Sequence, residues 1–111
     1  MRISWPDFEK VDMRVGVVTD ARDFPEARKP AYRLWIDFGP ELGVKRSSAQ
    51  ITAHYAAADL IGRRVIAVVN FPFKRIAGIV SEVLVLGAYS AEKDVVLLQP
   101  SLPVENGSRI G

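Results

Sequence analysis

The chain has 111 residues, of which 49% are hydrophobic, and this is enough to bury one core in a single domain, residues 1–111. It has no cysteine, which excludes a disulfide framework and a thiolate metal site; it also lacks a signal-peptide core and any apolar run of the roughly 18 residues of a membrane span. We therefore expect a cytoplasmic protein without membrane insertion. The formal net charge is only +2, but residues 28–81 hold nine Lys and Arg against three acids, so we also expect one basic region.

The first thirty residues predict a short helix, a strand and a loop. Trp5–Lys10 is the helical segment, and its proline is tolerated in a first turn. Val11–Val18 alternates between apolar and other residues, which predicts a half-buried strand with its odd-numbered residues inward. Residues 20–30 are polar and contain two prolines, which is typical of a connecting loop.

Ala31–Phe38 alternates again and predicts a second strand. This register turns Trp35 outward. A large exposed aromatic side chain often marks a contact surface, although a covering loop or helix would account for it equally well. The side chains expected to point inward are Tyr32, Leu34, Ile36 and Phe38.

Residues 44–51 predict a third strand that is unusually polar. Its small hydroxyl side chains permit the close approach of a partner and can bond phosphate or sugar oxygens. The alanine-rich segment that follows predicts a short helix, capped by Thr52 and ending near Leu60, with Gly62 stopping it. His54 is the single histidine, and we interpret it as a surface residue because a metal site needs several ligands.

The stretch from residue 64 to residue 87 organises the rest of the chain. Two apolar runs, Val65–Val69 and Val83–Leu86, predict buried strands. The segment between them begins with residues 70–75, which combine an amide, two phenylalanines and two cations, and Pro72 should take the chain out of the sheet. With a further strand at Val95–Leu98, the pattern predicts five or six strands in a small all-β barrel, because a lone open sheet would leave its edges unprotected.

Several blocks of the sequence, in this order, resemble the stand-alone tRNA-binding domains, and most closely their CsaA secretion-chaperone branch. The resemblance covers essentially the whole chain. It implies a five-stranded OB-fold barrel with short helices and with terminal extensions used in dimerisation. The blocks are FEKVDMRVG at 8–16, ARKPAYRLWIDFG at 27–39, GVKRSSAQIT at 43–52, LIG at 60–62, VVNFP at 68–72, SEVLVLG at 81–87 and NGSRI at 106–110.

The resemblance implies two functions. Related modules attached to tRNA synthetases bind tRNA, and the CsaA branch binds unfolded precursor polypeptides during export. Ser48, Asn70 and Ser81 match the polar residues of the tRNA-binding pattern. The chain departs from that pattern at Ala77, where arginine is usual, and at residues 83–84, where Gly-Met is usual; both departures are shared with the CsaA branch and argue against strong tRNA binding.

The candidate binding residues form a basic, polar set and an apolar set. The cations occur largely as neighbouring pairs, which either converge on a face that attracts a polyanion or are ordinary solvated strand ends. The phenylalanines are either exposed or part of the core. The nucleic-acid set is Arg28, Lys29, Lys45, Arg46, Ser47, Ser48, Gln50, Asn70, Lys74, Arg75 and Ser81, and the peptide set is Trp35, Phe71, Phe73, Ile76 and Ile79.

The sequence offers little for catalysis. One histidine, no cysteine and no Gly-rich phosphate loop argue against an enzyme, a metal or a cofactor, and Glu82 is more simply a salt-linked or hydrogen-bonded acid.

The chain ends carry apolar residues without an obvious core to join, and we therefore predict a homodimer in which the two ends pack across a two-fold axis. These end residues are Trp5, Phe8, Val104 and Ile110.

Overall fold

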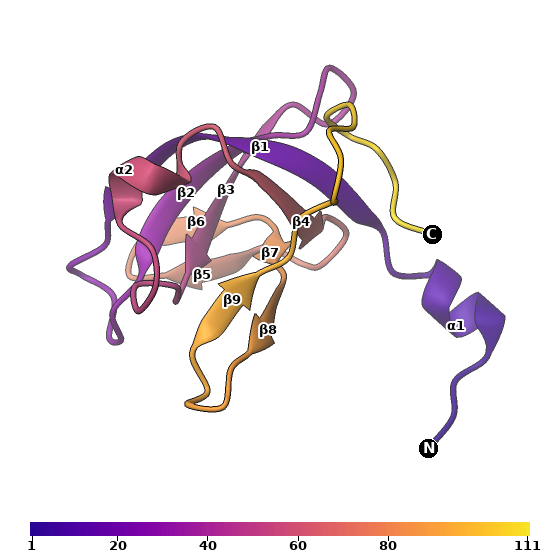
Figure 1. Ribbon diagram of the computed structural model, residues 1–111, viewed down its shortest axis with the longest axis horizontal. Coiled ribbons are helices and arrows are strands. Elements are labelled where there is room, and N and C mark those ends of the chain that lie inside the picture. Colours follow the sequence, from indigo (N-terminus) through magenta and orange to yellow (C-terminus); the bar gives the residue numbers. More distant parts are fainter.

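The computed structural model describes residues 1–111. Its main sheet has the strand order β3-β2-β1-β4-β7 and curls into a nearly closed antiparallel barrel, so the predicted all-β, OB-like fold is confirmed (Figure 1). No helix is long and apolar enough to cross a membrane. The elements are α1 Trp5–Glu9, β1 Met13–Asp23, β2 Tyr32–Asp37, β3 Val44–Ala49, α2 Ala57–Leu60, β4 Arg64–Val68, β5 Lys74–Ile76, β6 Ile79–Ser81, β7 Leu84–Val85, β8 Gly87–Tyr89 and β9 Val95–Leu97.

The core forms on the inner face of the curved sheet. Strand β2 supplies its centre as the sequence predicts, because Leu34, Ile36 and Phe38 are each at most 1% exposed and Tyr32 is nearly as buried. Leu60 of α2 closes one end of the barrel and is fully buried. The alternation in β2 therefore identified the core correctly, because each of its inward positions carries a large apolar residue.

Strand β1 differs from its prediction in length and in facing. It continues to Asp23, across a shift of register between Val18 and Asp20, so the start of the predicted loop is strand. Val18 is fully buried in the core, whereas Val17 is only half-buried, so the core-facing side is the opposite of the predicted one. Val15, which was predicted inward, is 1% exposed but lies outside the core cluster. Gly16 explains the reversal: a Cβ there would lie 2.6 Å from Ile36 Cγ2, so the inward position had no side chain to reveal it.

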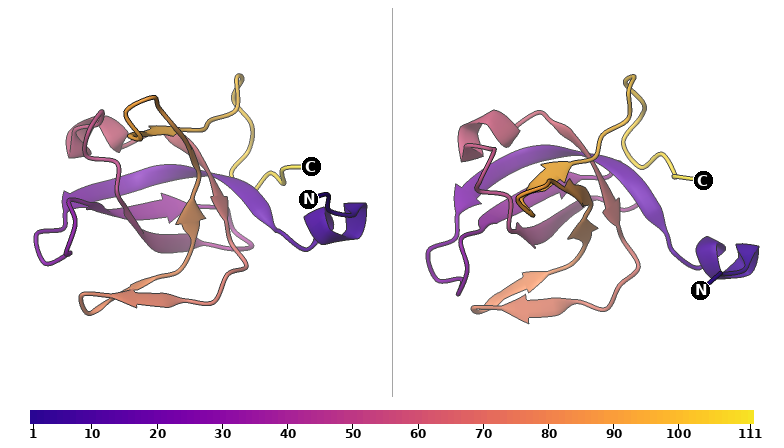
Figure 2. Two further views of the ribbon diagram at one scale, coloured as in Figure 1. Left: turned by 90° about the horizontal axis from the view of Figure 1, so that it is seen from below. Right: turned by 60° about the horizontal axis from the view of Figure 1, so that its bottom comes forward.

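The segment after β4 contains a hairpin that the sequence pattern did not predict. β5 and β6 pair antiparallel, and their two-residue turn, Ala77–Gly78, has positive φ at both positions (47° and 84°). Two central residues with φ above zero are the geometry of a tight hairpin turn. Lys74 and Ile76 therefore lie on a strand that projects from the barrel, below it in Figure 2, rather than on an irregular loop.

The connection through α2 is shorter than predicted. The helix covers only Ala57–Leu60, and its N-cap is Ala56, which has no side-chain cap. The predicted capping role of Thr52 is therefore wrong, because residues 52–54 form a separate turn before the helix. His54 is exposed as predicted, in that turn, and its Nε2 lies 3.5 Å from a carboxylate oxygen of Asp94.

The two chain ends behave differently. The C-terminal tail docks on β1: the Val15 N–H donates to the Ser108 carbonyl at 2.9 Å, and the Ile110 N–H donates to the Met13 carbonyl at 2.9 Å. Main-chain hydrogen bonds therefore hold the C-terminal segment to β1, and Ile110 is half-buried there. Helix α1 instead projects away from the barrel (Figures 1 and 2), and Trp5 remains 70% exposed with Phe8 as its aromatic neighbour.

Candidate ligand-binding pocket

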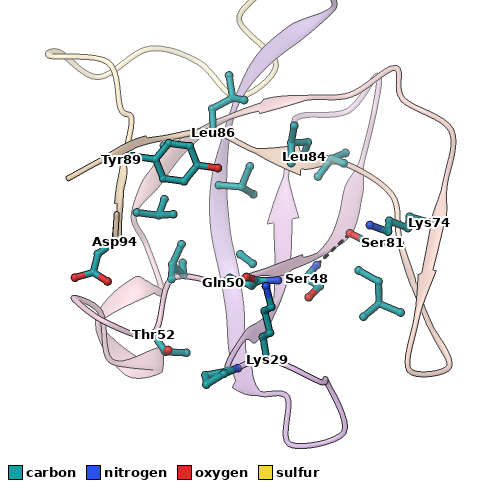
Figure 3. Close-up of a pocket in the computed structure, with 18 of the residues that line it drawn as sticks. Lys29, Ser48, Gln50, Thr52, Lys74, Ser81, Leu84, Leu86, Tyr89 and Asp94 are labelled. Atoms are coloured by element: carbon teal, nitrogen blue, oxygen red, sulfur yellow. Dashed lines mark hydrogen bonds between the residues drawn. The ribbon is translucent and has the colours of Figure 1, made fainter. Parts of the chain in front are cut away.

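A pocket of about 1000 Å³ opens where the barrel wall is incomplete, between the end of β3 and strand β7 (Figure 3). The loop after β4, the β5–β6 hairpin and the β8–β9 ribbon contribute further walls, and about half of the lining residues are hydrophobic. Such a mixture of apolar surface with a few polar groups is typical of binding sites. Seven predicted site residues line it: Lys29, Ser48, Gln50, Phe71, Lys74, Ile76 and Ser81.

Serine side chains join β3 to the segment that precedes β7. The Ser48 N–H donates to Ser81 Oγ at 3.1 Å, and the Ser47 hydroxyl donates to the Val83 carbonyl at 3.1 Å. Ser47 is only 3% exposed. Its buried hydroxyl therefore has a structural role in the barrel wall, where it joins β3 to the segment before β7, and we do not retain it among the proposed binding residues.

Glu82 neutralises part of the predicted basic set. Its carboxylate accepts from the Arg46 N–H at 3.0 Å and lies 3.5 Å from Arg46 Nε and 3.9 Å from Lys45 Nζ. The prediction that Glu82 is a salt-linked, hydrogen-bonded acid is confirmed, with partners on β3. Lys45 and Arg46 thus share one acid, and this reduces the positive charge they present to a ligand.

The cations without an ion pair lie around the pocket and beyond it. Lys29, from the loop between β1 and β2, and Lys74, from β5, both line the pocket, and no acid lies within 4.0 Å of either side-chain nitrogen. Arg28 and Arg75 are the exposed neighbours of these lysines but do not line the pocket. The charged residues of the lining are thus three lysines, Lys29, Lys74 and Lys93, against two acids, Glu82 and Asp94.

Both phenylalanines after β4 are exposed. Phe71 is 49% exposed and lines the pocket, whereas Phe73 is 64% exposed and lies outside the lining. Ile76 lines the pocket from β5, and Ile79 is half-buried outside it. Of the two alternatives for these rings, the structure therefore has the exposed one, because the chain leaves the sheet after Val68 and carries both rings out with it.

Trp35 lies away from the pocket. It is half-buried on the outer face of the sheet, with the guanidinium of Arg22 5.5 Å from its ring centroid. Its cross-strand neighbours are Asp20 on β1 and Arg46 on β3. Trp35 therefore packs against an arginine side chain and does not line the pocket.

Asn70 holds the N-terminal segment to the barrel. Its Oδ1 accepts from the Asp12 N–H at 3.0 Å, and its Nδ2 donates to the Lys10 carbonyl at 2.7 Å. These two bonds use the amide oxygen and one amide N–H, and Asn70 does not line the pocket. Its arrangement fits a structural role better than the predicted role in ligand binding.

Several pocket residues were not singled out from the sequence. Leu84 is 48% exposed and Tyr89 is 80% exposed, and both face the opening (Figure 3). The only sequence signal for Leu84 was its place in an apolar run, which predicts burial. Asp94 and Lys93 complete the far wall, in a turn whose composition is ordinary. No group of three or more His, Cys, Asp or Glu side chains is placed to hold a metal ion.

The family model described as a tRNA binding domain matches residues 13–109. The chain belongs to the tRNA binding domain family. A crystal structure of the chaperone CsaA from Bacillus anthracis is 56% identical, with a TM-score of 0.94 and complete coverage of both chains. The CsaA chaperone protein from Picrophilus torridus is 51% identical, with a TM-score of 0.93, over 99% of this chain and 100% of that one.

Methionine–tRNA ligases contain a related module. The enzyme of Porphyromonas gingivalis is 35% identical over 108 residues, which are 97% of this chain and 15% of the ligase. The chain thus spans about 15% of the length of these curated relatives and corresponds to one part of them. The tRNA binding domain family is a binding family and not a catalytic one, and the CsaA structures match this chain over its whole length.

Proposed function

We propose that this member of the tRNA binding domain family is a CsaA-like chaperone that binds unfolded precursor polypeptides during export, in the cytoplasm and without catalysis. The observation that carries the proposal is the pocket, which combines exposed apolar side chains with unpaired cations. Phe71 and Leu84 are about half exposed although both are large and apolar. Exposed apolar patches of this kind mark interaction sites.

The composition of the pocket suits an unfolded chain that carries some acidic residues. Its walls provide branched apolar side chains such as Ile76 and Val85, which offer non-directional contact to varied sequences. Lys29 and Lys74 at the rim attract carboxylates without requiring a fixed geometry. A ligand held in this way would be recognised by its accessible apolar residues and its charge.

A second ligand, tRNA, is favoured by the match to the family and by the exposed cations. Arg28, Lys29, Lys74 and Arg75 are all exposed, and Phe71 offers a ring on which a base could stack. The engagement of Asn70 within the chain and the partial neutralisation of Lys45 and Arg46 limit this surface. We therefore propose salt-sensitive tRNA binding as the alternative function.

We further propose that the protein is a homodimer. Helix α1 projects from the barrel with Trp5 70% exposed, and Leu102 and Val104 of the C-terminal segment are 73% and 40% exposed. These apolar side chains gain contacts if the ends of two chains pack against each other in an isologous interface.

The chaperone proposal is tested by placing a charge in the pocket. We expect Leu84→Glu to weaken the binding of reduced, carboxymethylated α-lactalbumin, a permanently unfolded polypeptide, in a fluorescence titration. The matched control is Val44→Glu, because Val44 is 55% exposed on β3 but lies outside the pocket. Equal affinities of the two variants and the wild type would overturn the assignment of the pocket.

A further inference from the structure

The wall of the barrel contains an open seam whose two edges face the pocket. In an antiparallel pair, every second residue of a strand directs its peptide N–H and C=O toward the neighbouring strand. The Phe38 N–H donates to the Gly43 carbonyl, which fixes this alternation between β2 and β3. The peptide groups of Arg46 and Ser48 therefore point away from β2. Glu82 and Ser81 satisfy Arg46 and the Ser48 N–H. Beyond Ser48 these bonds stop, and no hydrogen bond engages the N–H or C=O of Gln50.

The opposite edge is open in the same way. Leu86 donates its N–H to the Ile66 carbonyl at 2.8 Å, so the peptide groups of Leu86 and Leu84 face β4. The antiparallel alternation then turns the N–H and C=O of Val85, between them, away from β4 and toward the seam. No backbone hydrogen bond joins Val85 to β3, and both Val85 and Gln50 line the pocket.

We propose that an extended segment of an unfolded polypeptide binds in this seam as an added strand, with main-chain hydrogen bonds to the free peptide groups of Gln50 and Val85. The inference rests on the proposed function and specifies how the ligand is held. Strand addition makes affinity depend on the ligand backbone, so that many sequences can bind. Lys29 and Lys74 at the same pocket favour acidic residues in or beside the added segment.

The free groups favour a polypeptide over a nucleic acid. An extended peptide presents N–H donors and C=O acceptors together at every second residue along one edge, a spacing of about 7 Å. A phosphate group presents acceptors only, and the 2′-hydroxyls of RNA, although they can donate, do not repeat at the spacing of the N–H and C=O groups of a strand. Open strand edges are normally a liability for aggregation. Here both edges lie inside a concave pocket, where another folded sheet cannot reach them as easily as an extended segment.

Substitutions at Gln50 separate its backbone N–H from its side chain. Gln50→Pro removes the N–H at the end of an edge strand, where proline is tolerated, whereas Gln50→Ala removes only the side chain. We expect Gln50→Pro to bind unfolded α-lactalbumin roughly two- to tenfold more weakly than Gln50→Ala, which is the value of one hydrogen bond. Equal melting temperatures of the two variants establish that both are folded.

Modified peptides provide a second test, which uses only the wild-type protein and so does not depend on the folding of a substituted one. Wild-type protein is titrated with a synthetic peptide of about ten alternating apolar and acidic residues and with its singly N-methylated derivatives. Because alternate N–H groups of the added strand face Gln50 and Val85 in turn, strand addition predicts that methylation at neighbouring central positions weakens binding by about fivefold or more, while positions at the ends of the peptide tolerate it. Binding of the parent peptide that no single methylation weakens, together with equal affinities of Gln50→Pro and Gln50→Ala, would overturn strand addition and leave the proposed function intact. No binding of either the parent peptide or unfolded α-lactalbumin would instead refute the proposed function.

Discussion

Truncation of the two phenylalanines after β4 separates a binding role from a role in stability. Complete burial of a phenylalanine side chain contributes about 1.5–3 kcal/mol. Because Phe71 is 49% exposed and Phe73 is 64% exposed, only about half of this or less is realised in the fold. We therefore expect each Phe→Ala change to lower the free energy of unfolding by about 1 kcal/mol, and Phe73→Ala by less than Phe71→Ala.

Phe38 provides the matched reference. It is 1% exposed in the core, so Phe38→Ala should cost about 3–5 kcal/mol, from lost transfer energy and the cavity that remains. The three variants are compared by urea denaturation with a shared m-value, followed by titration of the folded proteins with unfolded α-lactalbumin and with tRNA. We expect Phe71→Ala to lose polypeptide affinity by about 2 kcal/mol if the ring is an anchor. A loss of stability near that of Phe38→Ala, with affinities unchanged, would refute the exposed placement of the rings and their role in binding.

Three further predictions concern the rim, the chain ends and the core. Lys29→Glu with Lys74→Glu should weaken tRNA binding and reduce the log–log salt slope by about one for each lost phosphate contact, whereas Arg2→Glu should leave it unchanged; an unaltered slope in the double variant would exclude these lysines from the contact. Sedimentation equilibrium at micromolar concentration should give twice the chain mass, and Trp5→Ala should shift this mass toward the monomer; a monomeric wild type would contradict the homodimer. Gly16→Ala should destabilise by about 1–3 kcal/mol in urea denaturation, because the new Cβ would overlap Ile36; a neutral effect would show that β1 can shift without cost.

The barrel was predictable where alternation and side-chain size agree. Strand β2 has a large apolar residue at each inward position, and its inner face was identified residue by residue. Strand β1 was misassigned because Gly16 fills an inward position with no side chain and because the register shift after Val18 extends the strand through polar residues. Periodicity cannot reveal an inward glycine, and a bulge removes the period on which the reasoning depends.

The pocket was predictable only in part, because the sequence does not show which polar groups form hydrogen bonds within the protein and which remain available to a ligand. Ser48 and Ser81 belong to one hydrogen-bonded pair at the seam, which their separation of 33 residues does not reveal. Ser47 and Asn70 carry the same kinds of polar atoms, yet one is buried in the wall and the other holds the N-terminal segment. The free backbone edges at Gln50 and Val85 have no side-chain signal at all, since they follow from strand pairing.

The most direct measurement of the central claim is a comparison of three ligands at two salt concentrations. Wild-type protein is titrated with unfolded α-lactalbumin, with tRNA and with duplex DNA at low and at high salt. Apolar contacts and main-chain hydrogen bonds are little affected by salt, whereas phosphate contacts weaken steeply. We predict that the unfolded polypeptide binds at both concentrations while the binding of both nucleic acids falls sharply at the higher one. Binding of tRNA without any binding of the unfolded polypeptide, at either salt concentration, would contradict the proposed function.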